Sequence, residues 1–348
     1  MAVSVEALHD VCMQALTRIG VSPSDAQTTA DALVLADTWG VYTHGSKLLA
    51  GYIRRLSGGG WNVTGRPVID REGPSWAIVD GAHALGQVGG EFSMSLAIAK
   101  AKTTGIAYVG MKNTAHIGAA GCFAAQAAQE GLIGIVTGND IPSVAAPNAR
   151  GAVLGSNPLA YSVPAKKHPP ILLDMATAAV AGGKVYAAHQ RGETIPATWL
   201  IGPDGHPTTD GSLYPQSASL APMAGHKGYG LGLLAEILAG VIPGGALTWQ
   251  VGSWIFDEAN LPSKHNAAFI AIDVQQFCGD SFGERVDYLI DELHQAPKAE
   301  GATRILVPGE LEWERREQAL KNGIPLPADV IEKLNIVTQQ FSLALPTI

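Results

Sequence analysis

Three basic side chains of this sequence, His44, His116 and Lys227, each stand within two residues of a glycine. Because glycine has no side chain, the backbone at such positions can approach a ligand closely. Imidazole changes its protonation state near neutral pH and so suits proton transfer, whereas an ammonium group suits a phosphate or a carboxylate. The three segments therefore indicate a site that binds an anion and moves a proton.

Strands that alternate with helices are expected to position these side chains. The middle of the chain predicts two helices, at 87–102 and 122–130, between three strands, at 76–80, 106–111 and 132–137. Such alternation is typical of a layered α/β architecture. Two more strands, at 159–163 and 171–175, follow without a long helix between them. The predicted fold class is therefore α/β, with a mixed sheet layered with helices.

The rest of the chain predicts further elements and one long irregular segment. The expected elements are a helix at 228–239, a strand at 267–273, a helix at 282–294, a strand at 304–307 and helices at 311–321 and 328–343. Segment 192–221 has little periodicity and many Pro, Gly, Ser and Thr residues. A loop of this length either covers a site or is a surface excursion, and both interpretations stay open.

The first seventy residues read as helical. Apolar residues recur every three or four positions in 5–16, Ser22-Pro23 offers a helix start, and a short helix is expected at 46–56, which places His44 in a turn between helices. The expected organisation is a helical domain built from 1–72 and 310–348, and an α/β domain, 73–309, that binds cofactor and substrate.

Two polar segments follow neighbouring strands of the chain. His116 lies past the strand that ends near Lys112, at the sheet edge where α/β proteins usually bind ligands. Asn139 and Asp140 follow the next strand in the equivalent position. If the two strands are neighbours, His116 and Asp140 point into one crevice, and the carboxylate would raise the pKa of the imidazole or orient its ring. The alternative is a solvated turn, since Asn and Asp are common turn formers.

Asp174 and Lys227 are candidates for contacts to a larger ligand. Asp174 follows an apolar run and precedes small residues, so it could accept hydrogen bonds from ribose hydroxyls or cap a following helix. Lys227 opens an apolar helix, where a cation is unfavourable for the helix itself. This mismatch favours an anion at the same place, typically a phosphate.

Composition excludes several classes of function. The formal net charge of −8 disfavours nucleic-acid binding, and no apolar run approaches the roughly 18 residues of a membrane-spanning helix. The three cysteines are widely spaced and the N-terminus does not read as a secretory signal, so a cytoplasmic protein without membrane association is expected. The ten histidines lack metal-ligand spacing, and no metal is expected. No G-x-G-x-x-G follows a predicted strand, and P-loop, H-E-x-x-H and G-x-S-x-G motifs are absent from the sequence.

The order of the motifs along the chain resembles the type-2 malate/L-lactate dehydrogenase family. That family includes ureidoglycolate dehydrogenase, 2,3-diketogulonate reductase, sulfolactate dehydrogenase and Δ1-piperideine-2-carboxylate reductases. The similarity runs nearly end to end through Thr43-His44-Gly45, Leu85-Gly86-Gln87, His116-x-Gly118-Ala119-Ala120-Gly121, Gly155-Ser156-Asn157-Pro158, Leu173-Asp174-Met175-Ala176, Pro207-Thr208-Thr209-Asp210, His226-Lys227-Gly228-Tyr229-Gly230, Pro308-Gly309-Glu310 and Gly323-Ile324.

The resemblance implies an oxidoreductase that uses NAD or NADP in a non-Rossmann fold, acts on a C–O or C–N bond next to a carboxylate, and is usually a homodimer. His44 would be the proton donor and acceptor, with His116 as a second catalytic or orienting group. The positions expected to face the substrate are Thr43, Lys47, Leu48, Arg54 and Asp140. The positions expected to contact the cofactor are Gly118, Gly121, Asn139, Asp174, Met175, Ala176, His226, Lys227, Pro308, Gly309 and Glu310.

The chain departs from the family at the substrate site. The family usually reads Ser-His-Gly-x-x-Arg, where the arginine grips the substrate carboxylate in a fork, but here that position is Leu48. The usual Asn-Ser after the third strand is Asn139-Asp140. Three hypotheses follow. The substrate acid is held by Lys47, Arg54 or Arg150; the substrate is less anionic or carries an amine or imine that Asp140 favours; or the protein is a catalytically degenerate binding paralogue. The choice between NADH and NADPH stays open.

Overall fold

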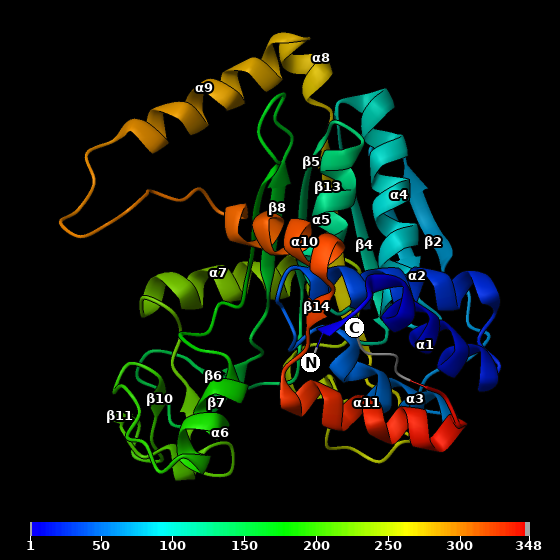
Figure 1. Cartoon of the computed structure of the whole chain (residues 1–348). Coiled ribbons are helices and arrows are strands. Elements are labelled where there is room, and N and C mark those ends of the chain that lie inside the picture. The colour runs from blue at the N-terminus through cyan, green and yellow to red at the C-terminus, as the bar shows by residue number, and fades with distance from the viewer. Residues whose placement is uncertain (1, 345–348) are drawn as a thin grey trace.

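Figure 1 shows the computed structural model, which describes residues 2–344. Helices from both ends of the chain lie together at one side of a large sheet. These are α1 (Val5–Arg18), α2 (Pro23–Thr38), η1 (Ser46–Leu48), α3 (Leu49–Ser57), α10 (Glu310–Asn322) and α11 (Ala328–Phe341), and β1 (Ala2–Val3) pairs with β14 (Ile324–Pro325). The expected helix start at Ser22 is confirmed, because the Asp25 N–H donates to Ser22 Oγ at 3.3 Å. The exact division into domains remains a prediction.

The central sheet has seven strands in the order β2-β3-β4-β13-β5-β8-β9. Their bounds are β2 (Val68–Gly73), β3 (Trp76–Asp80), β4 (Ile106–Thr114), β13 (His265–Ile272), β5 (Ile133–Gly138), β8 (Leu159–Val163) and β9 (Ile171–Met175). β3 and β4 are parallel, and the other neighbouring pairs are antiparallel. The predicted mixed sheet is thus confirmed. However, β4 and β5 are not neighbours, because β13 from the C-terminal half lies between them.

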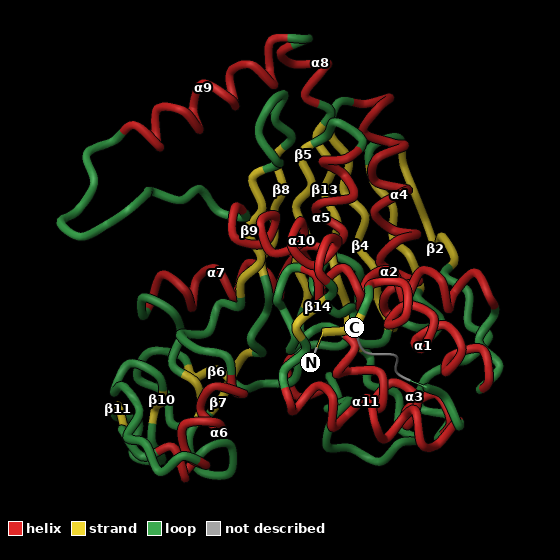
Figure 2. The backbone as a smooth tube through the Cα atoms, viewed as in Figure 1, coloured by secondary structure: helices red, strands yellow, loops and turns green. Residues whose placement is uncertain are grey.

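The core forms where α4 (Gly86–Thr104) and α5 (Ala120–Gln129) cover the sheet (Figure 2). Buried apolar side chains of β4 and β13, such as Val109 and Phe269, pack beneath these helices. The approach of α4 requires glycine, because a methyl group at Gly90 would meet the ring of Phe123. This tight packing fixes the ends of β4, β5 and β13, from which the polar residues discussed below extend.

A smaller lobe contains a second sheet, in the order β11-β10-β12-β6-β7. Its elements are β6 (Val144–Ala145), β7 (Ala152–Leu154), α6 (Gly182–Gln190), β10 (Leu200–Ile201), β11 (Pro207–Thr208), η2 (Gly211–Leu213) and β12 (Ser219–Leu220). Figure 1 shows this lobe below α7 (His226–Glu236). Segment 192–221, expected to be irregular, therefore contributes short strands. They were missed because two-residue strands carry no detectable period.

The expected strand at 304–307 is wrong: these residues form an extended connection. α8 (Val274–Cys278) and α9 (Ser281–Gln295) lead away from the sheet, and the chain returns through a long loop (Figure 2). The returning segment is joined to β9 by a backbone hydrogen bond, in which the Pro308 carbonyl accepts from the Leu172 N–H at 2.9 Å. A single hydrogen bond makes no ladder, although the apolar run resembles a strand in sequence.

The expected helix at 228–239 corresponds to α7 and the π-helical turn η3 (Ile237–Val241), followed by the short turn η4 (Thr248–Gln250). Among residues 2–344, none of the helices combines the length and the apolar character that crossing a bilayer would require.

Candidate active site

Three imidazole rings lie in a row where the helical segments meet the central sheet. The ring centroids of His44 and His116 are 5.7 Å apart with the planes at 30°, and those of His116 and His265 are 6.0 Å apart at 78°. His44 belongs to the turn before η1, His116 follows β4, and His265 opens β13. The structure thus brings together the two histidines singled out in the sequence and adds a third.

His265 was missed because its position depends on strand order. It is paired with Thr114 across β4, just before a register shift in the β13–β4 ladder. Such irregularities re-aim side chains at strand ends. The sequence offered one signal, a histidine just before the strand predicted at 267–273. Such a signal does not indicate which strands lie on either side of that strand in the sheet.

The orientation of His116 is fixed by α3 and α4. The Gln87 amide donates to Tyr52 Oη at 3.1 Å, so the single Tyr52 hydroxyl proton can be donated to His116 Nδ1, 2.8 Å away. Burial raises the pKa of Tyr52, which keeps that proton in place at neutral pH. With Nδ1 accepting, neutral His116 carries its own proton on Nε2. Trp254 stacks on the His116 ring, with 5.0 Å between the ring centroids.

The turn that carries His44 is held by Asp37 at the end of α2. The Ser46 N–H donates to Asp37 Oδ2 at 2.9 Å, and a methyl group at Gly45 would overlap the same carboxylate. Burial raises the pKa of Asp37 to about 7, with the hydrogen bonds from Ser46 opposing that rise. Thr43 Oγ1 lies 3.0 Å from His44 Nδ1, so this threonine contacts the imidazole itself.

Asp140 lies beside the row of imidazoles, although β13 separates its strand from β4. His265 Nε2–H donates to Asp140 Oδ1 at 3.1 Å, and the Ile141 N–H donates to the same oxygen at 2.8 Å. Burial alone would raise the pKa of this carboxyl, but the hydrogen bond from His265 and the electrostatic influence of the nearby His265 and His116 rings lower it overall. The solvated-turn alternative therefore does not hold for Asp140.

Burial keeps the first two imidazoles neutral at neutral pH. It lowers the pKa of His44, while the charges of Asp174 and Asp140 act in the opposite direction. The pKa of His116 falls to about 3, because burial and the neighbouring His44 and His265 outweigh the attraction of Asp140. A neutral imidazole can accept a proton, and a neighbouring carboxylate stabilises the cation that results.

Several predicted cofactor residues lie in β9, in the first turn of α7, and in the loops after β4 and before α10. Asp174 lies in β9 and is exposed, and its Oδ2 accepts from the Gly121 N–H at 2.7 Å, so it caps α5 rather than a following helix. Gly118 and Gly309 both adopt positive φ, at 78° and 97°. Met175 and Ala176 are half-buried, whereas His226 and Lys227 are exposed in the first turn of α7.

Two of the predicted cofactor residues have their polar atoms engaged by protein. Asn139 is buried, and its amide donates to Glu236 Oε1 at 3.2 Å and to the Ala246 carbonyl at 2.9 Å. Glu310 accepts from the Val307 N–H at 3.0 Å and lies 2.6 Å from His294 Nε2, beside Pro308. Asn139 therefore positions the backbone before Asp140, and Glu310 holds the returning segment.

The cations proposed to replace the family arginine are directed elsewhere. Lys47 Nζ forms an ion pair with Asp329 Oδ2 at 2.6 Å. Arg54 donates to three carbonyls of one loop, those of Trp254, Ile255 and Asp257, at 2.9 to 3.2 Å. Leu48 packs against the N-terminal core, and Arg150 is exposed in the smaller lobe next to Gly205.

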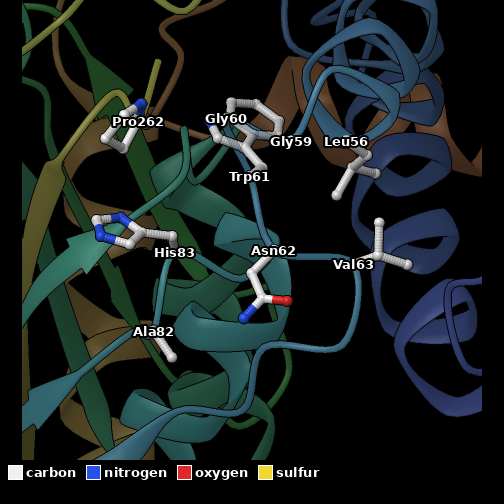
Figure 3. Close-up of a pocket in the computed structure, with 9 residues that line it drawn as sticks. All are labelled: Leu56, Gly59, Gly60, Trp61, Asn62, Val63, Ala82, His83 and Pro262. Atoms are coloured by element: carbon white, nitrogen blue, oxygen red, sulfur yellow. The ribbon is translucent and has the colours of Figure 1, made fainter. Parts of the chain in front are cut away.

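The structure also contains a separate cavity of about 530 Å³, and Figure 3 shows the residues that line it. Trp61, one of its walls, packs edge-on against Tyr52 at 5.1 Å. The cavity is lined by Leu56, Gly59, Gly60, Trp61, Asn62, Val63, Ala82, His83 and Pro262. It is therefore distinct from the row formed by His44, His116 and His265. Among residues 2–344, groups of three or more His, Cys, Asp or Glu arranged for a metal ion are absent.

The mixed sheet and the paired imidazoles define an α/β protein with an acid–base site. The chain belongs to the malate/L-lactate dehydrogenase family, whose pattern matches residues 3–335. It is 38% identical to a malate dehydrogenase of Pyrococcus horikoshii, over 97% of this chain and 95% of the relative. It is 33% identical to an NAD(+) ureidoglycolate dehydrogenase of Escherichia coli O157:H7, over 96% and 95% of the two chains.

The fold agrees with a solved member of the same group. The sulfolactate dehydrogenase of Methanocaldococcus jannaschii superposes with a TM-score of 0.92 at 33% identity, over 99% of this chain and 98% of that one. The resemblance inferred from the motifs is confirmed, and the protein is an oxidoreductase.

The low pKa of His116 predicts a loss of stability in acid. Between the ordinary pKa of about 6.5 and the folded value of about 3, the unfolded chain binds a proton at this ring that the folded chain excludes. Stability is therefore fully present above pH 6.5 and is lost as the pH falls. Glutamine does not titrate, so His116→Gln should lack this contribution. We expect the unfolding free energy of the variant to fall less steeply than that of the parent, by about 1 kcal/mol per pH unit between pH 6 and roughly pH 4.

Urea denaturation at several pH values measures this slope. The control is His189→Gln, because His189 is exposed on α6 and should leave the slope of the parent protein. Equal slopes for the parent and the His116 variant would contradict the low pKa.

Proposed function

We propose that this protein is an NAD(P)-dependent dehydrogenase or reductase that moves a hydride between nicotinamide and a small 2-oxo or 2-hydroxy acid. The observation that carries the proposal is the adjacent pair of imidazoles, 5.7 Å apart, with His116 oriented by Tyr52. Relatives at 38% and 33% identity are named malate dehydrogenase and NAD(+) ureidoglycolate dehydrogenase, which supports both the reaction class and the cofactor class.

The imidazoles supply the proton chemistry of this reaction. A bound nicotinamide would supply or accept the hydride. In reduction, protonated His44 donates to the substrate oxygen, so that negative charge does not accumulate on the forming alkoxide. In oxidation, neutral His44 removes the hydroxyl proton. His116 presents its Nε2–H beside His44 and orients the substrate oxygen through a hydrogen bond.

The exposed residues of β9 and of the first turn of α7 have the chemistry to bind a dinucleotide. Lys227 and the first-turn N–H groups of α7 offer a cation and hydrogen-bond donors to phosphate, and Gly225 before them has a φ of 64°. Exposed Asp174 offers a carboxylate oxygen for ribose hydroxyls, and Gly309 lets the backbone pass close to β9. We propose that these residues hold the cofactor, with Gly118 and Gly121 at the nicotinamide end.

We further propose that the substrate preference differs from that of relatives with an arginine at position 48. Leu48 cannot bind a carboxylate, and Lys47 and Arg54 are engaged by Asp329 and by loop carbonyls. Asp140 adds negative charge beside His116. The arrangement therefore favours substrates less anionic than dicarboxylates. The charge of Asp140 also favours a second candidate, an imine reductase, because a protonated imine would be attracted to it.

The exposed apolar side chains of α7 and η3 support a homodimer. Leu234, Ile237 and Val241 are 50%, 40% and 52% exposed and recur at the spacing of one helical face. Such a contiguous apolar face favours burial against another protein surface. We propose a second copy of this chain as the partner, and a cytoplasmic protein, since its described cysteines are not paired in disulfides.

A substrate screen tests the reaction class. Purified protein would be assayed for oxidation of NADH and NADPH with oxaloacetate, pyruvate and glyoxylate, each with and without methylamine. We expect turnover with a 2-oxo monoacid at a higher kcat/KM than with oxaloacetate. A rate that requires methylamine would select imine reduction, and cofactor binding without any turnover would contradict both enzymatic proposals.

Removing His44 tests the assignment of the proton donor. We expect His44→Ala to lower kcat by on the order of 100-fold, as loss of a general acid usually does. Cofactor affinity should change little, because the ring interacts with the reacting atoms. A kcat equal to that of the parent would remove His44 from the mechanism.

Lys227→Ala tests the proposed binding of the cofactor by the first turn of α7. The loss of a charge-assisted hydrogen bond should weaken cofactor binding by about 10-fold or more, measured by fluorescence titration, with a smaller effect on kcat. Lys184→Ala is a suitable control, since Lys184 is exposed on α6. Equal affinities of the Lys227 variant and the parent would contradict the role.

A further inference from the structure

Asp140 and His265 form a hydrogen-bonded pair, and the proton transfer proposed for His44 and His116 gives this pair no role. The two side chains come from different places in the chain, Asp140 after β5 and His265 at the start of β13, and are joined by a hydrogen bond of 3.1 Å. His265 is buried, with 3% of its surface exposed, and the Asp140 side chain is 31% exposed. The pair therefore has one end inside the protein and one end open to the site.

The backbone around the pair is held in place by neighbouring amides. The Asn139 N–H donates to the Asn266 carbonyl at 3.1 Å, and the Asn266 N–H donates to Asn139 Oδ1 at 3.1 Å. The Asp140 N–H donates to Asn157 Oδ1 at 3.2 Å. Because β5, β13 and the segment before β8 are all joined here, the Asp140 carboxylate has little freedom to move away from His116.

We propose that Asp140 and His265 form a positioning pair, in which His265 holds the Asp140 carboxylate beside the catalytic imidazoles so that its charge stabilises the protonated form of His44. The inference rests on the proposed function only in taking His44 as the proton donor. In this role Asp140 and His265 are positioning residues, because the charge of Asp140 acts on His44 and His265 holds that charge in place.

The surroundings of the imidazoles show why this charge matters. The groups that face His44 and His116 are Asp174 from β9, Asp140 after β5, His265 from β13 and Tyr52 from α3, and Tyr214 of the smaller lobe is close enough to sense the charge of Asp140. Burial lowers the pKa of His44, and of these groups Asp174 and Asp140 oppose the fall. Asp174 Oδ2 already accepts a hydrogen bond from the Gly121 N–H at the start of α5.

The charge alone can be removed by Asp140→Asn. An asparagine oxygen can still accept from His265 and from the Ile141 N–H, so both hydrogen bonds survive while the negative charge is lost. We expect the protonation midpoint of His44 to fall by about one pH unit, the usual effect of one nearby opposite charge. The pH above which reduction slows should fall by the same amount.

The first measurement needs no substrate. Protein labelled with ¹⁵N at histidine would be titrated by NMR, and His44 would be assigned from the spectrum of His44→Gln. The matched control is Asp31→Asn, because Asp31 forms a similar pair with His9, 3.0 Å apart, on the outer face of α1 and α2. A shifted His44 midpoint in Asp140→Asn but not in Asp31→Asn supports the proposal, and an unchanged midpoint in Asp140→Asn overturns it.

Variants of His265 test the second half of the pair. His265→Gln retains an N–H that can reach Asp140 and should keep the His44 midpoint of the parent, whereas His265→Ala should lower it part of the way. An unchanged midpoint in His265→Ala would overturn the positioning role of His265. Because these titrations are made without turnover, they remain decisive if the substrate screen fails, and a shifted midpoint with an inactive enzyme would contradict the proposed function alone.

Discussion

The insertion of β13 between β4 and β5 is the constraint on which the site depends. β13 runs antiparallel to both neighbours, so its first residues lie where β4 and β5 end. His265 therefore lies beside both His116 and Asp140: its ring packs edge-on against His116, and its Nε2 donates a hydrogen bond to Asp140. The same arrangement lets Asn266 bind the backbone of Asn139. Without β13 at this place in the sheet, the Asp140 carboxylate would lose the hydrogen bond from His265.

Burial and charge act against each other around the imidazoles. Burial, to which Trp254 and Tyr52 contribute, acts with the neighbouring His44 and His265 to lower the pKa of His116 to about 3. Carboxylates placed at the edge of the same region reduce this effect for His44. An imidazole that must alternate between neutral and charged forms needs both influences: too much burial would prevent protonation, and too much negative charge would prevent release.

Two cations that the sequence placed at the substrate end of the site have partners within the protein. Arg54 ties the loop that carries Trp254 to α3, and Lys47 ties η1 to α11. Both side chains therefore hold neighbouring segments of the protein together. With Leu48 packed against the N-terminal core, a fork for a substrate carboxylate is not rebuilt from these three positions.

The sequence by itself determined the class of fold, the family and two of the three imidazoles. The strands at β3, β8 and β9 and the start of α2 follow from local periodicity and capping, which neighbouring residues control. Only the tertiary structure decided that Arg54 and Lys47 face other partners, that residues 304–307 form no strand, and that His265 holds Asp140. These depend on contacts between segments more than a hundred positions apart or on an absent sheet neighbour, and local sequence patterns carry no record of either.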